Sequence, residues 1–173
     1  MRRLGFGLAA TAIGFAIALV LLETGFRLFW QLPPWLAELQ QAGLYVDTGD
    51  GGAALQPGYR GTLRIGDGYT TTVEVDAIGL RGRDRGRKRA GERRVLMVGD
   101  SLVFGYGVEG DEALPACLER ELAARGVEVT IGNGGVPSFG SQHAVAHMDR
   151  LDEPFAADAF VVCGFVGNDA VDE

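Results

Sequence analysis

Apolar positions fall into three arrangements along this chain. Leu4–Leu22 is a run of nineteen residues without a charge, about the length that crosses the hydrocarbon core of a bilayer as a helix. Between Gln31 and Arg94, apolar residues are scattered among glycine, proline and charged residues. From Val95 onward, short apolar runs alternate with stretches that have apolar residues at helical spacing. This last pattern is typical of βαβ units and therefore of a parallel sheet in an α/β fold.

The alternation predicts three strands and two helices in the carboxyl-terminal half of the chain. The strands are Val95–Val98, Val127–Ile131 and Ala159–Cys163, and the helices are Ala113–Ala124 and Gln142–Leu151. Helical spacing of leucines supports the first helix, and the glycine that follows it is a typical helix end.

The first thirty residues predict a transmembrane signal-anchor helix. Arg2 and Arg3 precede the apolar run and favour an amino end in the cytoplasm. Trp30 and Trp35 follow it, where an interfacial aromatic belt is expected. The remainder of the chain would then lie in the periplasm or outside a bacterial cell, anchored in the inner membrane by a single span, Leu4–Leu22.

A cleaved signal peptide is the alternative. Ala16-Ile17-Ala18 has the small-residue spacing that a signal peptidase recognises. This tripeptide lies inside the apolar run, however, and Leu19–Leu22 after it is still apolar, which favours an anchor that is retained. Glu23 and Arg27 are four residues apart and could pair on one helix face.

Three segments are expected along the chain: 1–30 as cytoplasmic tip and anchor, 31–92 as a connecting region, and 93–173 as the main domain. Within the connecting region, Gln31–Gln56 is rich in proline and glycine and predicts a stalk or an irregular connection. The β-prone Thr70–Val75 could pair with Leu63–Ile65 in a small hairpin. The basic stretch Arg83–Arg94 is interpreted as a solvated loop, with anionic lipid as an alternative contact.

Polar and glycine-rich segments follow each of the three predicted strands. Ser101 follows the first strand, Gly132–Gly140 the second, and Gly167-Asn168-Asp169 the third. Carboxyl ends of parallel strands meet at one edge of the sheet, which is where open α/β sheets bind ligands. A serine hydroxyl with nearby N–H donors suits acyl transfer, because the hydroxyl attacks a carbonyl and the donors stabilise the oxyanion.

With these motifs in this order, the chain resembles the SGNH, or GDSL, hydrolase family. The resemblance covers about Arg93 to Asp169 and includes Gly99-Asp100-Ser101-Leu102, Asn133 to Ser138 and Gly167-Asn168-Asp169. It implies a flavodoxin-like three-layer α/β/α fold, here incomplete, and ester-directed chemistry without a cofactor or metal. Ser101 would be the nucleophile and an oxyanion donor through its N–H, and Asn168 would donate through its side-chain amide.

Two positions depart from the family pattern. Ser138 stands where the family's second glycine falls, so its N–H is only a candidate third oxyanion donor. Val166 stands where the third block usually has glycine, although Gly167 still precedes Asn168. The upstream Ile78–Gly82 and the apolar amino end also look like the membrane-anchored bacterial members.

The family's base-bearing Asp-X-X-His has no counterpart here. Since a serine hydroxyl is a poor nucleophile without a base, we expect this sequence to be a carboxyl-terminally truncated copy of a longer protein, inactive or feeble by itself. Its longer parent would act on an ester-bearing lipid, glycan or small molecule. Water or a sugar hydroxyl could accept the acyl group.

Several other residues allow different chemistry. His143 and His147 have a spacing that can bind a metal, but no third ligand accompanies them. Gly105–Gly110 fits the letters of a dinucleotide-binding loop but begins well past the strand end, so loop flexibility is the preferred explanation. Cys117 and Cys163 are either two buried thiols or a disulfide.

The net charge of the chain argues against one class of binding partner, nucleic acid. The chain has a net charge of −7, and its main domain is acidic, which argues against nucleic acid because phosphate binding needs a basic face. Two alternatives to an enzyme stay open: an anchored, non-catalytic ligand-binding domain of the same fold, and a flavodoxin-like nucleotide or flavin binder.

Overall fold

The computed structural model describes residues 2–29, 43–49, 52–65 and 69–165. The chain divides into two compact units, Met1–Pro34 and Trp35–Glu173, and each is described by itself.

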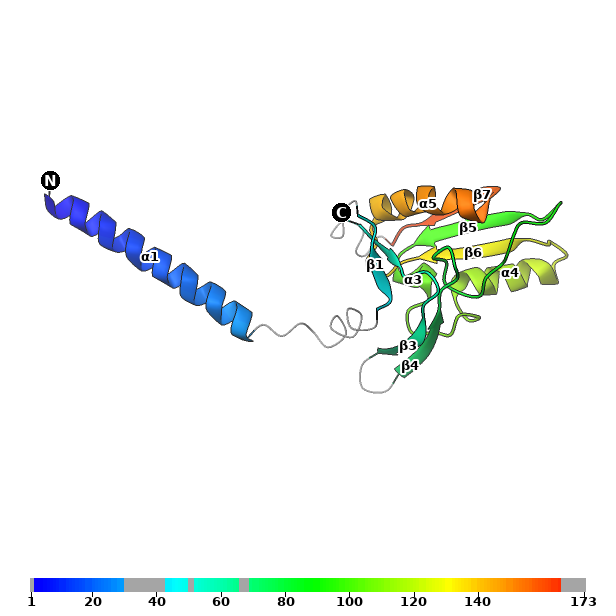
Figure 1. Cartoon of the computed structure of the whole chain (residues 1–173), viewed down its shortest axis with the longest axis horizontal. Helices are drawn as coiled ribbons and strands as arrows, with labels where there is room; N and C mark the ends of the chain where they lie inside the picture. Colours follow the sequence, from blue (N-terminus) through cyan, green and yellow to red (C-terminus); the bar gives the residue numbers. More distant parts are fainter. Residues whose placement is uncertain (1, 30–42, 50–51, 66–68, 166–173) are drawn as a thin grey trace. The chain divides into compact units, whose positions relative to one another are not determined.

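The described residues of the first unit form the helix α1, at Arg2–Phe29 (Figure 1). Near its end, the Arg27 Nε donates to Glu23 Oε1 over 2.7 Å, which confirms the expected pair. Within the described residues, no helix combines the length and the apolarity needed to cross a bilayer, so the transmembrane prediction for Leu4–Leu22 is not confirmed.

The second unit is built around a parallel sheet of three strands, ordered β6-β5-β7 (Figure 1). The strands are β5 at Arg94–Gly99, β6 at Thr130–Gly135 and β7 at Ala159–Cys163. In register, Gly99 at the end of β5 lies opposite both Gly135 and Cys163. All three carboxyl ends therefore meet at one edge, as the sequence predicted.

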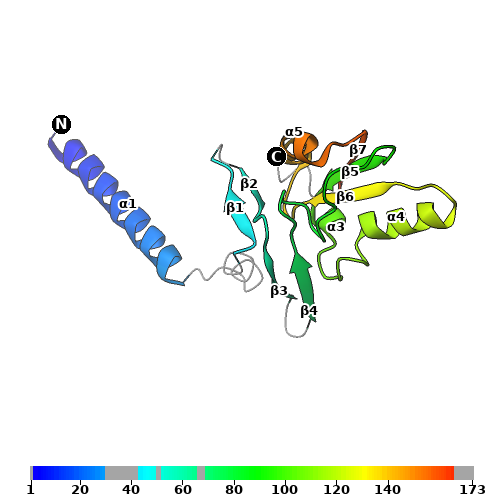
Figure 2. The ribbon, with the colours of Figure 1, turned by 45° about the vertical axis from the view of Figure 1, so that its right-hand side comes forward.

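Helices cover both faces of this sheet (Figures 1 and 2). On one face, α4 at Leu114–Ala124 packs through Leu118 and Leu122 against Met97 and Ile131. On the other face, α5 at Ser141–Phe155 packs through Ala144, Leu151 and Phe155 against Leu96 and Val98 of β5. The predicted α/β fold with a parallel sheet is confirmed for the described residues.

Two antiparallel hairpins precede the sheet in the chain. They are β1 at Tyr45–Asp47 with β2 at Ala53–Leu55, and β3 at Arg60–Ile65 with β4 at Tyr69–Glu74. The second hairpin confirms the prediction, although its turn lies outside the described residues. Both hairpins share a buried cluster with residues that follow β5 and β6, which comprises Leu44, Leu55, Leu63, Val73, Val75, Phe104, Val136 and Phe139.

The first hairpin lies in the described part of Gln31–Gln56, where an irregular stalk was expected; residues 31–42, 50 and 51 lie outside the described residues. Its strands have only three residues each, too few to produce a recognisable alternation. The hairpin is stabilised instead by tertiary contacts, since Leu44 and Leu55 are almost fully buried.

The basic stretch Arg83–Arg94 is only partly the solvated loop that was predicted. Arg94 is 2% exposed, and its guanidinium donates to Glu92 Oε1 over 2.9 Å and to the Phe155 carbonyl over 3.2 Å. The charge is thus buried with hydrogen-bonded partners, the condition under which proteins tolerate it.

Candidate active site

Ser101 lies at the carboxyl end of β5, the central strand. The next strand in the chain, β6, pairs with one side of β5, and the one after it, β7, pairs with the other side. The strand order therefore reverses at β5. Such a switch point is where open α/β sheets bind ligands. Ser101 is half-buried, and Leu102 beside it is exposed.

Ser101 begins a single helical turn, α3, at Ser101–Phe104. Asp100 is the N-cap, and its Oδ1 accepts from the Leu102 N–H over 2.9 Å. At the other end, Gly105 has a φ of 82°, a left-handed conformation that favours glycine. The Ser101 carbonyl accepts from the N–H groups of Gly105 and Tyr106 over 3.0 and 2.9 Å, so the backbone of the candidate nucleophile is fixed locally.

The segment after β6 packs directly on this turn. The Val136 N–H donates to the Gly99 carbonyl over 3.0 Å, which joins the ends of the two strands. A Cβ atom built on Gly135 would lie 2.1 Å from the Phe104 nitrogen, so only glycine allows this approach. Gly132–Gly135 form most of β6, so the expectation that they belong to a loop is wrong.

Asn133 ties β6 to the same turn. Its Nδ2 donates to the Phe104 carbonyl over 3.3 Å and its Oδ1 accepts from the Gly135 N–H over 3.0 Å. The residue is 7% exposed. Asn133 is therefore a buried residue that binds the last carbonyl of the Ser101-bearing turn. This contact was not predicted from the sequence.

Ser138 lies just beyond, in an exposed turn after β6. Its φ is 66°, in the left-handed region that L-residues other than glycine rarely adopt. This is the position where the family resemblance expects glycine, and the backbone has the conformation that suits glycine.

We therefore expect Ser138→Gly to raise the free energy of unfolding by about 1 kcal/mol, since relief of the left-handed strain outweighs the added entropy of the unfolded chain. Denaturant unfolding measures this. Ser141→Gly, at the start of α5 with an ordinary backbone conformation, is the matched control and should be neutral or destabilising. Equal effects of both substitutions would contradict the strain argument.

Asn168, the other predicted oxyanion donor, lies outside the described residues, as do Val166 and Gly167. Within residues 2–29, 43–49, 52–65 and 69–165, no side chain forms a hydrogen bond with the Ser101 hydroxyl. The described residues thus contain the candidate nucleophile and its supporting backbone, without a base.

The cysteines and histidines form neither a disulfide nor a cluster of metal ligands in the described part of the chain. Cys117 and Cys163 are both free, so the disulfide alternative is wrong. Burial, and then the Asp100 carboxylate, raise the pKa of the Cys163 thiol, which keeps it protonated and unreactive at neutral pH. His143 is exposed and His147 is buried, and the described residues contain no cluster of three metal ligands.

The segment Gly105–Gly110 does not lie where a dinucleotide-binding loop must lie. It begins after α3 instead of directly after a strand. Two of its backbone carbonyls accept hydrogen bonds from Arg81. The Arg81 guanidinium donates to the Gly105 carbonyl and the Val108 carbonyl, each over 2.7 Å.

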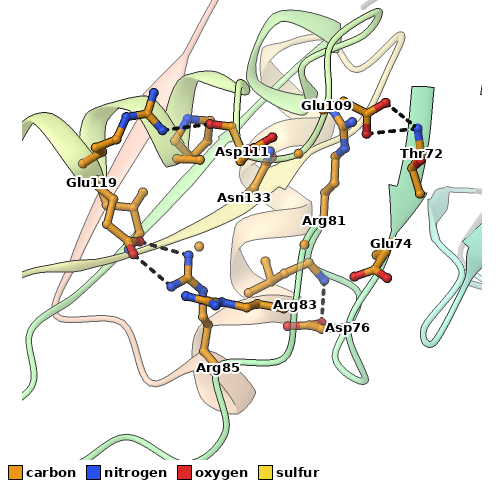
Figure 3. A pocket seen from close by; sticks show the side chains of 18 of the residues that line it. Thr72, Glu74, Asp76, Arg81, Arg83, Arg85, Glu109, Asp111, Glu119 and Asn133 are labelled. Atoms are coloured by element: carbon orange, nitrogen blue, oxygen red, sulfur yellow. Dashed lines mark hydrogen bonds and ion pairs between the residues drawn. The ribbon is translucent and has the colours of Figure 1, made fainter. Parts of the chain in front are cut away.

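A cavity of about 560 Å³ lies on the α4 side of the sheet (Figure 3). Both arginines and carboxylates line it, and Arg83 is one of the arginines. Arg85 and Glu119 form an ion pair there, with Arg85 Nη1 2.9 Å from Glu119 Oε1. Arg81 also lines the cavity. Burial lowers the pKa of its guanidinium, and the negative charge of Glu109 partly offsets this by raising it. Ser101 does not line this cavity, so the cavity is separate from the candidate active site.

Comparison with known proteins gives a limited result. No family model and no curated protein matches the chain. Among solved structures, the chain is similar to the crystal structure of AlinE4, an SGNH-hydrolase family esterase, with 32% identity and a TM-score of 0.40 over 47% of this chain and 44% of that chain. A variant of the same esterase matches at 30% identity with the same coverage and TM-score. The chain spans less than half the length of these structures.

Proposed function

We propose that this chain carries the nucleophile-bearing part of a serine ester hydrolase or acyl-transfer enzyme of SGNH/GDSL type. The observation that carries the proposal is the place of Ser101, half-buried at the first position of α3, at the carboxyl end of the central strand. The first N–H groups of a helix have no partner within that helix. The Ser101 N–H is therefore available to an oxyanion.

In the proposed reaction, the Ser101 Oγ attacks the carbonyl carbon of an ester while a base takes its proton. The Ser101 N–H and the Asn168 side-chain amide stabilise the oxyanion of the tetrahedral intermediate, with the Ser138 N–H as a candidate third donor. The intermediate collapses to an acyl-enzyme as the alcohol leaves with the proton. Water or a sugar hydroxyl then accepts the acyl group.

The proposal needs a base from outside this sequence, because the sequence contains no Asp-X-X-His. By itself the chain is expected to retain only the weak catalysis that binding and an oxyanion hole supply.

A fluorophosphonate probe tests the nucleophile in a protein that contains this chain together with such a base. We expect one covalent label, at Ser101. The chain has three serines, Ser101, Ser138 and Ser141, so peptide mass spectrometry assigns the label without ambiguity. Ser101→Ala should abolish labelling, and Ser141→Ala should retain it. A folded protein that takes no label would instead support the non-catalytic ligand-binding domain.

The proposal includes attachment to a bacterial inner membrane, with the amino end in the cytoplasm and the enzyme domain in the periplasm. Its support is the uncharged run Leu4–Leu22 within α1, which is 28 residues long, roughly 42 Å at the usual helical rise. Large apolar side chains on α1, such as Phe15 and Leu22, are 67% and 70% exposed. A helix with apolar residues all round is normally covered by protein or lipid.

Carbonate washing of bacterial membranes tests this attachment. We expect the full chain to stay with the membranes, because the burial of an apolar helix in lipid does not depend on charge, and a chain that begins at Gln31 to be released. Mass spectrometry of the amino end separates an anchor from a signal peptide cleaved after Ala18. Recovery of the intact chain in the washed supernatant would exclude the anchor.

A further inference from the structure

Arg81 contacts the Ser101-bearing turn, although it precedes Ser101 by twenty residues. Its backbone forms isolated antiparallel bridges with Val75 and with Asn133, and its N–H donates to the Asn133 carbonyl over 2.9 Å. The residue is thereby fixed at the outer edge of β6, the strand that packs on α3. Figure 3 shows the Arg81 side chain extending past Asn133 toward Glu109.

The Arg81 guanidinium binds the end of α3 with three hydrogen bonds. Its Nη1 donates to the carbonyls of Phe104 and Gly105, and its Nη2 donates to the Val108 carbonyl. The carbon of the guanidinium also lies 4.4 Å from the centre of the Phe104 ring. The Phe104 carbonyl therefore accepts hydrogen bonds from both Arg81 and Asn133. Phe104 is the last residue of α3, the helical turn that begins at Ser101.

This arrangement is unusual for a buried cation. Arg81 is 5% exposed, yet no carboxylate in the described part of the chain lies within ion-pair distance of it. A buried charge without a counterion is costly unless hydrogen bonds satisfy it. Here backbone carbonyls at and after the end of α3 accept from Nη1 and Nη2, where partial negative charge favours a cation, while Nε is buried without a partner among the described residues. The planar fork of arginine donates from separate nitrogens in a fixed geometry, whereas the three donors of a lysine ammonium share one nitrogen.

We propose that Arg81 is a positioning residue, which fixes the Asp100–Gly105 turn from its carboxyl end and thereby sets the place of the Ser101 hydroxyl and N–H. The inference rests on the proposed function for the role of Ser101. The hold of Arg81 on the turn is a separate claim that can be measured without any chemistry at Ser101.

Amide hydrogen exchange measures the hold directly. The N–H groups of Gly105 and Tyr106 both donate to the Ser101 carbonyl, so they report whether the turn is closed. In Arg81→Lys we expect these two amides to exchange about tenfold faster or more, while amides in β5 change little. Arg83→Lys, an exposed arginine two residues along, is the matched control and should leave both amides unchanged. A folded R81K chain with unaltered protection at Gly105 and Tyr106 overturns the proposal.

The unaltered chain provides a second check that needs no variant. If Arg81 closes the turn, the amides of Gly105 and Tyr106 should exchange slowly for so short a helix. Exchange as fast as that of the exposed Gly110 would overturn the proposal even if R81K failed to fold.

The consequence for chemistry is tested in the longer, base-containing protein with the fluorophosphonate probe. We expect R81K to lower the maximal rate of Ser101 labelling about tenfold or more, the scale expected of a displaced reacting group, with little change in the probe concentration for half-maximal rate. R83K should change neither quantity. A lower affinity for the probe at an unchanged maximal rate would contradict positioning. Absence of labelling in the unaltered protein would refute the proposed function, and hydrogen exchange would still decide the role of Arg81.

Discussion

Gly135→Ala should weaken the second unit by at least about 3 kcal/mol or prevent it from folding. A Cβ atom at this position would lie 2.1 Å from the Phe104 nitrogen and 2.6 Å from the Val103 carbonyl carbon. Both neighbours are backbone atoms of α3, which cannot move aside as a flexible side chain can. The methyl group would have to push the Ser101-bearing turn away from β6.

Denaturant unfolding of the two alanine variants Gly135→Ala and Gly110→Ala measures this effect. Gly110 is the matched control, because a Cβ atom there has no neighbour within 4 Å and its φ is not in the left-handed region. We expect G110A to change the free energy of unfolding by less than about 0.5 kcal/mol. If G135A were as stable as G110A, the tight contact between β6 and α3 would be wrong.

The elements predicted well from the sequence are those with a strong local signal. The uninterrupted apolar run of β5 and the helical spacing in α4 predicted both elements within one or two residues. The strand β7, at Ala159–Cys163, was predicted with its observed bounds. In β5 and α4 the side chains that form the pattern also form the packing contacts, whereas the first four residues of β7 are exposed in the described structure.

The strand β6, Thr130–Gly135, was predicted to begin three residues and to end four residues too early, because its sequence contains three glycines. Glycine is depleted in strands, so the run was interpreted as a loop. The structure shows why glycine stands there: a Cβ atom on Gly132 would lie 2.8 Å from the Phe155 ring, and one on Gly134 would lie 2.9 Å from a Val98 methyl group. Those constraints come from other elements and leave no local signal.

The candidate site was predicted in the same uneven way. Ser101 could be found because a small polar motif follows an apolar strand, a local pattern. Arg81 and Asn133 could not, because their roles depend on the carbonyl of Phe104, which is distant from both in sequence. A charged side chain is usually expected to be solvated. Nothing in the sequence shows which arginine is buried and hydrogen-bonded to backbone carbonyls.

Acidification from pH 6.5 to about 4 should remove about 3 kcal/mol of stability through His147 alone. His147 is 2% exposed, and neither ring nitrogen has a hydrogen-bond partner among the described residues. Its ring lies edge-on to Phe139, with the ring centres 5.5 Å apart. Burial, and to a lesser degree Arg150, lower the pKa of His147 from 6.5 to about 4.

The direction follows from that lowered pKa. In the unfolded chain the imidazole takes up a proton near pH 6.5, whereas in the folded chain it stays neutral down to about pH 4. The stabilising contribution is complete above pH 6.5 and is lost progressively as the pH falls between these values. Glu92 titrates in a lower window, because hydrogen bonds from Arg94 and Arg89 lower its pKa from 4.5 to about 2. The two effects can therefore be separated by pH.

His147→Leu isolates the first window. Leucine fills similar space and cannot be protonated, so the free energy of unfolding of H147L should fall much less than that of the unaltered chain between pH 6.5 and about 4. His143→Leu, on the exposed side of the same helix, is the matched control and should keep the acid sensitivity of the unaltered chain. Denaturant unfolding at several pH values in this window gives the comparison. Parallel pH profiles for H147L and the unaltered chain would show that the buried imidazole is not the group that responds to acid.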